Sequence, residues 1–145
     1  MNWARASTVA FAVVVGAGAG LVWRGALFGA GPVTIAIQAA SVLLMIWARA
    51  TFGLRSFHAA ANPTAGGLVT GGPYRYLRHP IYAAILYFVW AGVAAHVSLV
   101  NALLALLASV MLAVRMRAEE TLIVGRYPEY ADYARRTRRV VPFLF

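Results

Sequence analysis

Hydrophobic residues gather in four long runs that are separated by polar stretches of unequal length. The runs cover about residues 7–23, 33–48, 80–96 and 98–116. A helix needs about 20 residues to cross a bilayer, so each run extends by about a turn into flanking residues that suit the interface. The third and fourth runs nearly touch, which predicts a tight helical hairpin. The pattern therefore predicts an all-α, polytopic integral membrane protein with about four transmembrane helices.

The first run is also compatible with a signal peptide, because a basic residue precedes a short apolar segment that is rich in small residues. Removal of that segment would leave three runs, so we favour a membrane span and a single membrane domain over residues 1–145. Gly16, Gly18 and Gly20 lie within this run. Small residues in a membrane helix allow a neighbouring helix to approach closely, and we expect that role here.

Two polar segments follow the second and fourth runs, and both contain signals for where further helices begin. Pro80 begins the third run, where proline suits the first turn of a helix. Pro128 interrupts the C-terminal tail, and residues 129–136 after it share a tyrosine-bearing face, with Tyr130 and Tyr133 three positions apart. A basic helix with aromatic residues suits the headgroup region. We therefore expect a C-terminal amphipathic helix on the cytoplasmic surface.

The composition supports membrane insertion and excludes several kinds of chemistry. The chain is 62% hydrophobic and only 12% charged, and its mean hydropathy is +0.73. A soluble domain keeps about a quarter of its residues charged. Cysteine is absent, which excludes disulfides, thiolate metal sites and cysteine nucleophiles. His58, His79 and His96 do not have a metal-ligand spacing, so we expect no metal.

The charge pattern indicates how the chain is oriented. All 13 basic side chains are arginines, and against four acids they give a net charge of +9. In a soluble protein this balance would suggest nucleic acid, but here the arginines flank apolar runs, so we expect membrane lipids and no nucleic acid. Only Arg24 falls on the far side of a four-span arrangement. The asymmetry predicts cytoplasmic termini and a cytoplasmic site, in a plasma membrane that we expect to be bacterial. No pattern specifies an oligomeric state.

The segment from Gly71 to Tyr82 (GGPYRYLRHPIY) gathers two Arg, one His and three Tyr at a membrane boundary. Arg78 and His79 directly precede the predicted helix start, where free backbone N–H groups favour an anion. They could equally anchor the helix among lipid headgroups. The acids Glu119 and Glu120 adjoin each other beyond the fourth run, and Arg115 lies four residues before Glu119. This spacing fits a helix-surface ion pair, or a carboxylate for a polar cofactor beside an arginine for an anionic substrate.

Together these residues resemble a known family. The segment Leu68–Tyr82, followed by Arg115 and then Glu119-Glu120, resembles the isoprenylcysteine carboxyl methyltransferase family, which is related to the membrane phospholipid methyltransferases. The hallmark is an Arg-His-Pro-x-Tyr motif paired with a later Glu-Glu, and the resemblance covers about the C-terminal half of the chain. Ala84 departs from the pattern, because the family usually has glycine there.

The resemblance implies a membrane methyltransferase that uses S-adenosyl-L-methionine (SAM) and no metal, with cofactor-site segments at residues 66–82 and 115–133. The residues that it assigns to the cofactor are Gly66, Gly67, Leu68, Val69, Tyr74, His79, Pro80, Ile81, Tyr82 and Glu119. Glu120 and Arg78 are possible additions. Arg115 would orient the anionic group of the substrate, and we expect a lipophilic acceptor from the bilayer, favouring a carboxylate such as an isoprenylcysteine-like compound.

Other functions stay open at this point. The acceptor could be a phospholipid amine or a small thiol. A non-catalytic protein that binds lipid or a partner through its arginines is the alternative from another class. A small multidrug-type transporter also has four spans, but such a carrier needs an acid within the membrane. None of the four apolar runs contains Asp or Glu within its apolar core, which argues against a transporter.

Overall fold

Helices dominate the part of the chain that the structure describes, residues 2–53 and 67–141 of a computed structural model. The elements in chain order are α1 (Trp3–Trp23), α2 (Pro32–Phe52), the short 3-10 helix η2 (Gly72–Arg75), α3 (Pro80–Ala95), α4 (Leu99–Arg126) and α5 (Tyr130–Arg136). No strand occurs among these described residues, and 77% of the structure is helical. The prediction of an all-α membrane protein is therefore confirmed.

The helices begin where local sequence favours a helix start. The side chain of Asn2 caps α1 by accepting a hydrogen bond from the Arg5 amide at 3.2 Å. Ser98 caps α4 in the same way, through the Asn101 amide at 3.1 Å. Pro32 and Pro80 occupy the first positions of α2 and α3. A cap satisfies an amide that has no partner within the helix, and proline has no amide to satisfy.

In the part of the chain that the structure describes, three helices are long and apolar enough to cross a membrane: α1, α2 and α4. The third predicted span, α3, has only 16 residues and a length of about 24 Å, below the roughly 30 Å of the hydrocarbon core. α4 continues beyond the fourth predicted span, residues 98–116, as far as Arg126. This extension carries both adjacent glutamates beyond the apolar part of the helix.

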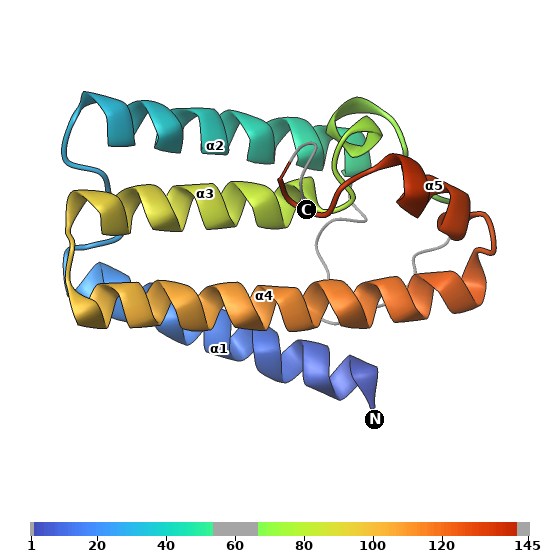
Figure 1. Cartoon of the computed structure of the whole chain (residues 1–145), viewed down its shortest axis with the longest axis horizontal. Coiled ribbons are helices and arrows are strands. Elements are labelled where there is room, and N and C mark those ends of the chain that lie inside the picture. The colour runs from blue at the N-terminus through green and yellow to red at the C-terminus, as the bar shows by residue number, and fades with distance from the viewer. Residues whose placement is uncertain (1, 54–66, 142–145) are drawn as a thin grey trace.

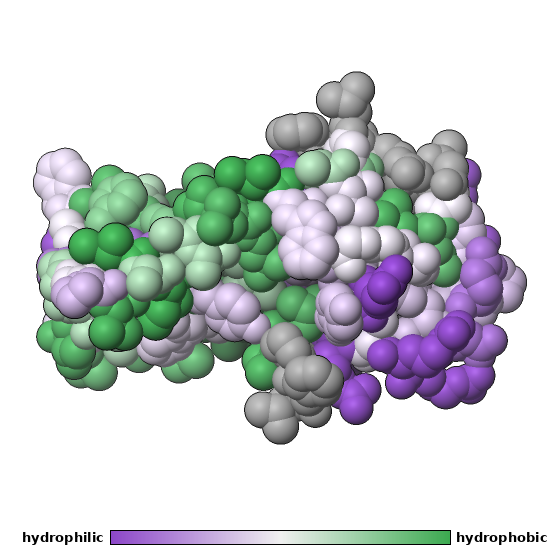
Figure 2. Space-filling model, turned by 90° about the horizontal axis from the view of Figure 1, so that it is seen from above, coloured by the Kyte–Doolittle hydropathy of each residue, from purple (hydrophilic) through white to green (hydrophobic). Residues whose placement is uncertain are grey.

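The helices pack as two pairs. α1 packs along α4, and α2 packs along α3, while α3 and α4 are joined by a short turn and touch less extensively. Figure 1 shows the N-terminus of α1 at the same end of the bundle as η2 and α5. Figure 2 shows hydrophobic residues gathered over the opposite part of the molecule, with hydrophilic ones mostly at the η2 and α5 end. The polar segments before α3 and after α4 thus meet at one end of the bundle, as the predicted α3–α4 hairpin requires.

The glycines of α1 correct one expectation. A Cβ atom built on Gly20 would lie 3.3 Å from the Leu104 side chain of α4, so Gly20 does sit at a close helix contact. The same atom on Gly16 or Gly18 would meet nothing within 4 Å. These two glycines were predicted to serve helix packing, and the prediction is wrong for them because no neighbouring helix approaches either position.

The residues after α5 fold back over the start of α3. We call Thr137 to Val141 the C-terminal strap. Leu77 and Arg138 form an isolated parallel bridge, in which the Arg78 amide donates to Arg138 O at 2.6 Å and the Arg138 amide donates to Tyr76 O at 3.1 Å. The His79 amide adds a hydrogen bond to Arg139 O at 3.0 Å. Val140 is buried in a hydrophobic cluster with residues of α3 and α4. The strap therefore fixes the backbone that leads into α3.

Candidate functional site

Polar side chains converge where α3 begins and α4 leaves its apolar part. His79 and Tyr82 come from the start of α3, and Arg115, Glu119 and Glu120 come from α4. Hydrogen bonds or ion pairs link all five. The structure thus brings together the two segments that the sequence indicated. We call these five residues the polar cluster.

Arg115 is the buried centre of the polar cluster, with only 3% of its surface exposed. Its Nε donates to the Tyr82 hydroxyl at 3.0 Å, and its Nη1 donates to the backbone oxygen of Ser7 at 3.0 Å. Its Nη2 lies 3.3 Å from Glu119 Oε1. The ring of Phe11 lies 5.1 Å from the guanidinium carbon. Arg115 therefore joins α1, α3 and α4, and it holds both Tyr82 and Glu119 in place.

Glu119 is the more accessible acid of the pair. Its Oε1 accepts a hydrogen bond from the Tyr82 hydroxyl, and its Oε2 lies 3.6 Å from Nδ1 of His79. The rings of His79 and Tyr82 stack, with centroids 5.6 Å apart and planes 21° apart. The side chain of Glu119 keeps 22% of its surface exposed. A carboxylate held from three sides and open on the fourth can accept hydrogen bonds from a ligand.

Glu120 shares His79 with Glu119 and also contacts two arginines, Arg78 and Arg139. Arg78 Nε lies 3.1 Å from its Oε1, His79 Nε2 lies 3.2 Å from the same oxygen, and Arg139 Nη2 lies 2.9 Å from Oε2. The hydrogen bond to Glu120 raises the pKa of Arg139, against the opposing effect of burial. Glu120 therefore connects α4 to the start of α3 and to the strap.

Arg78 completes this connection. Its Nη1 donates to the backbone oxygens of Ala134 at 2.7 Å and Thr137 at 2.6 Å, at the end of α5. Its side chain is 10% exposed. The interpretation of Arg78 as an anchor among lipid headgroups is therefore not supported, because the guanidinium is directed into the protein. Arg78 and Glu120 were named as possible cofactor ligands, and their contacts are those of residues that hold the strap.

Tyrosines flank the polar cluster on the α5 side. Tyr74 is buried, its ring lies 5.5 Å from that of Phe52, and its backbone oxygen accepts from the Tyr133 hydroxyl at 2.7 Å. Burial, with Tyr133 and Glu119 nearby, raises the pKa of Tyr74. Burial also raises the pKa of Tyr133 to about 12, although Arg78 acts in the opposite direction. Both phenols therefore stay protonated near neutral pH.

Gly72 explains how Tyr74 reaches this place. Its φ of +52° lies in the left-handed region, and a Cβ there would crowd Thr51 and Trp47 of α2. Only glycine adopts this backbone without strain and at this distance. The Gly71-Gly72-Pro73 turn thus lies against the end of α2 and directs the following tyrosine inward.

The remaining predicted cofactor residues are not members of the polar cluster, and the structure gives mainly their burial. Pro80 is buried and Ile81 half-buried in the first turn of α3, where no capping side chain occurs among the described residues. Leu68 and Val69 are half-buried and Gly67 is exposed. Gly66 lies outside the described residues. Sequence reasoning missed Ser7, Phe11 and Arg139, because each reaches the polar cluster only through the tertiary fold.

The bundle and the polar cluster together define an integral membrane protein with a charged, tyrosine-lined site at the end of its apolar helices. The family description that matches the chain is phospholipid methyltransferase, over residues 26–130. The match covers more than half of the sequence, so the chain belongs to the phospholipid methyltransferase family, within the isoprenylcysteine carboxyl methyltransferase superfamily. The resemblance carried by the Arg-His-Pro-x-Tyr and Glu-Glu motifs is thereby confirmed.

Two curated relatives are similar over part of the chain. One is the cobalt-zinc-cadmium resistance protein CzcN of Cupriavidus metallidurans, 38% identical over 78 residues, or 53% of this chain and 36% of the relative. The other is the nickel-cobalt-cadmium resistance protein NccN of Alcaligenes xylosoxydans xylosoxydans, with the same identity over 78 residues and 37% of its length. The chain thus spans little more than a third of these relatives. No solved structure matches.

Proposed function

We propose that the protein transfers a methyl group from SAM to a lipophilic acceptor at the cytoplasmic boundary of the membrane. The observation that carries this proposal is Glu119, a carboxylate fixed by Arg115 and Tyr82 yet still 22% exposed. The family supports methyl transfer. The arginine asymmetry of the sequence supports the cytoplasmic orientation.

The residues present fit the chemistry of SAM. That molecule supplies an electrophilic methyl group on a sulfonium sulfur, and it carries amino and hydroxyl donors, a carboxylate and an adenine ring. Glu119 would accept from the donors, while the N-terminus of α3 would favour the carboxylate. The stacked rings of His79 and Tyr82 would offer an aromatic wall, which suits an adenine or a sulfonium.

Arg115 was predicted to orient the anionic group of the substrate. In the structure its guanidinium contacts Tyr82, Ser7 and Glu119. We therefore give Arg115 a positioning role: it holds the carboxylate and the phenol at the distances that ligand binding needs. We also expect Arg115 to contact the acceptor, whose carboxylate would replace one of these three partners at the guanidinium.

The contacts of the acids favour an acceptor that is already ionised. A protonated amine must lose a proton before it attacks, and the candidates to take that proton are His79 and Glu120. Glu120 is occupied by Arg78, Arg139 and His79, and both nitrogens of His79 face carboxylates. A carboxylate or a thiolate needs no such base, so its methylation depends mainly on alignment and on exclusion of water. We therefore favour a carboxylate acceptor, with a thiolate as the alternative.

The proposal is tested by replacing Glu119 with alanine and comparing it with Glu129→Ala, which removes an exposed acid outside the polar cluster. Hydrogen bonds to charged groups contribute about 1.5–3 kcal/mol, so SAM affinity should fall roughly tenfold to hundredfold. The measurements are calorimetric SAM titration in detergent and transfer of radiolabelled methyl groups into a lipid extract. Unchanged affinity in Glu119→Ala, or equal losses in both variants, would contradict the assignment.

A further inference from the structure

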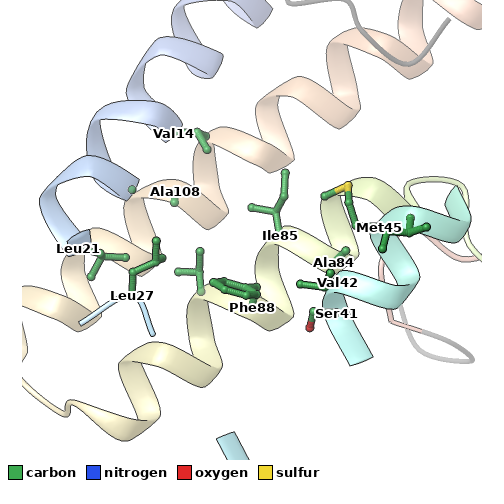
Figure 3. Close-up of a pocket in the computed structure, with 13 residues that line it drawn as sticks. Val14, Leu21, Leu27, Ser41, Val42, Met45, Ala84, Ile85, Phe88 and Ala108 are labelled. Carbon is green, nitrogen blue, oxygen red and sulfur yellow. The ribbon is translucent and has the colours of Figure 1, made fainter. Parts of the chain in front are cut away.

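An apolar cavity of about 320 Å³ lies between the two helix pairs. Figure 3 shows Leu21 and Leu27 on one side of it and Met45 on the other, with Ile85 and Phe88 of α3 between them. All four long helices and the α1–α2 connection contribute to its wall. Its volume lies at the small end of ligand pockets, which span about 300–1,000 Å³. One aliphatic chain fits such a space better than two.

The helices place this cavity below the polar cluster. On α1, Ser7 and Val14 are seven residues apart, on one face and about 10 Å apart along the axis. On α4, Arg115 and Ala108 have the same spacing, and on α3 Tyr82 precedes the cavity residue Ile85 by three positions. The same faces that carry the polar contacts of the cluster therefore continue into the cavity wall.

Ser7 adds a polar group at the top of this path. Its residue surface is fully buried, and its hydroxyl oxygen has no hydrogen-bond partner among the described residues. Its backbone oxygen already binds Arg115. A buried hydroxyl without a partner costs free energy, which a ligand oxygen beside Arg115 would recover. Phe11 follows Ser7 by one turn on the same face of α1, before the cavity residue Val14, and is 42% exposed.

The connection from Arg24 to Gly31 lies at the end of the bundle away from the polar cluster (Figure 1), and its Leu27 lines the cavity there. The side chain of Gln38, buried in α2, holds this connection through two backbone groups: it donates to Leu27 O at 2.8 Å and accepts from Gly29 N at 2.8 Å. It also donates to Phe88 O of α3 at 3.0 Å. Ala26 is fully buried. The connection thus turns into the bundle at Ala26, and the next side chain, Leu27, lines the cavity.

Two more contacts hold this connection in place. A Cβ on Gly92 of α3 would overlap the carbonyl oxygens of Leu27 and Ala26, so only glycine lets the connection lie so deep. Arg24 Nε donates to Asn101 Oδ1 at 2.6 Å, which fastens the same connection to α4. A wall held by hydrogen bonds to both helix pairs is suited to stop a chain at a fixed depth.

From this arrangement we propose that the cavity binds the single aliphatic chain of the methyl acceptor, and that Leu27 is the end stop that limits its length. The polar end of the acceptor lies at Ser7 and Arg115, and its chain runs past Phe11 into the cavity. This inference rests on the proposed function for the nature of the ligand. The inference goes beyond the proposed function because it assigns selectivity for the length of the acceptor chain to named residues.

Gly18 and Gly16 of α1 provide a matched test. Gly18 lines the cavity, Gly16 is exposed, and a side chain on either would meet nothing within 4 Å at its Cβ. The probes are alkanoic acids of graded length with a diazirine on the last carbon, added to the protein in phospholipid nanodiscs. Photolabelled positions are mapped by mass spectrometry, and methyl transfer to the same acids is measured in parallel.

In the unmodified protein we expect labelling at Leu27 or Phe88 up to a limiting length, and a roughly tenfold or greater loss beyond it, because one misfit methylene changes binding by about that factor. Gly18→Leu should shift the limit to shorter acids and Leu27→Ala to longer ones, while Gly16→Leu leaves it unchanged. Opposite shifts cannot arise from general destabilisation. An identical limit in all four proteins would overturn the end stop.

The two readouts separate this inference from the proposed function. Labelling with the expected limits but without methyl transfer would support the chain site and reject methylation of a carboxylate. Methyl transfer that ignores chain length in every variant would support the proposed function and overturn the end stop. Labelling spread evenly over lipid-exposed residues, including Leu43 of α2 (66% exposed), would also overturn it.

Discussion

Replacing Glu120 with alanine removes the carboxylate that joins α4 to the start of α3 and to the strap. Three partners, Arg78, His79 and Arg139, lie within 3.2 Å of its oxygens. The side chains of Glu120 and Arg78 are 13% and 10% exposed, so solvent screens this pair only weakly. Breaking a buried ion pair by removing one partner costs about 3–5 kcal/mol, because the remaining charge is left without compensation. We expect a destabilisation in the lower part of that range, since Arg139 is 24% exposed.

The matched control is Asp132→Asn. Asp132 also pairs with an arginine, Arg135, but their side chains are 60% and 76% exposed. Such an exposed pair contributes less than about 1 kcal/mol. Both variants remove one negative charge from the same end of the molecule, so a larger loss in Glu120→Ala would come from the buried contacts of that side chain.

Two measurements check the expectation. Thermal unfolding in a mild detergent should show a clearly lower Tm for Glu120→Ala than for Asp132→Asn. Hydrogen exchange should show faster exchange at the amides of Arg78 and His79, which donate to the strap. If exchange there is unchanged while Tm falls, the strap is held by the burial of Val140 and by the Tyr87 hydroxyl, which donates to Val140 O. Equal Tm values in the two variants would refute the reasoning about Glu120.

Two further substitutions test other buried polar contacts. Arg115→Lys keeps the charge, but an ammonium cannot bond to Tyr82, the Ser7 backbone and Glu119 at once. SAM affinity and turnover should therefore fall together by about tenfold or more. Unchanged values in SAM titration and methyl-transfer assays would remove Arg115 from its positioning role. Gln38→Leu removes three hydrogen bonds to backbone groups, which contribute about 1 kcal/mol each, so stability should fall by about 3 kcal/mol in unfolding experiments. Ser41→Ala breaks one bond within α2. A loss in Gln38→Leu no larger than in Ser41→Ala would show that the α1–α2 connection is held in another way.

The helices and the polar end of the bundle could be predicted because their signals are local. The apolar runs, the caps at Asn2 and Ser98 and the prolines at the helix starts all act within a few residues of the chain. The near-contact of the third and fourth runs then required the start of α3 and the end of α4 to meet. These features therefore needed no knowledge of the tertiary fold.

The contacts that organise the cluster could not be predicted, because they join residues far apart in the sequence. Arg115 bonds to Ser7, which is 108 positions away, and Arg78 bonds to the end of α5, which is 59 positions away. Neither partner offers a side-chain signal, since both provide backbone oxygens. The strap also gives no sequence signal. No sequence pattern around Val140 indicates burial, because its burial depends on how the tail returns to Leu77. Arg78 was consequently interpreted as a ligand or an anchor, whereas its partners are within the protein.

The adjacent glutamates show how one helix separates stability from ligand binding. Consecutive residues on a helix point about 100° apart, so Glu119 faces Tyr82 and Arg115 while Glu120 faces Arg78 and Arg139. His79 lies between them, with one ring nitrogen toward each carboxylate. A change at Glu120 must therefore reach Glu119 mainly through His79. It follows that Glu120→Ala should lower Tm strongly and SAM affinity only weakly. Glu119→Ala should lower SAM affinity strongly and Tm only weakly. If both variants lost affinity and stability in the same proportion, the two carboxylates would act as one unit, and the separation inferred from their contacts would be wrong.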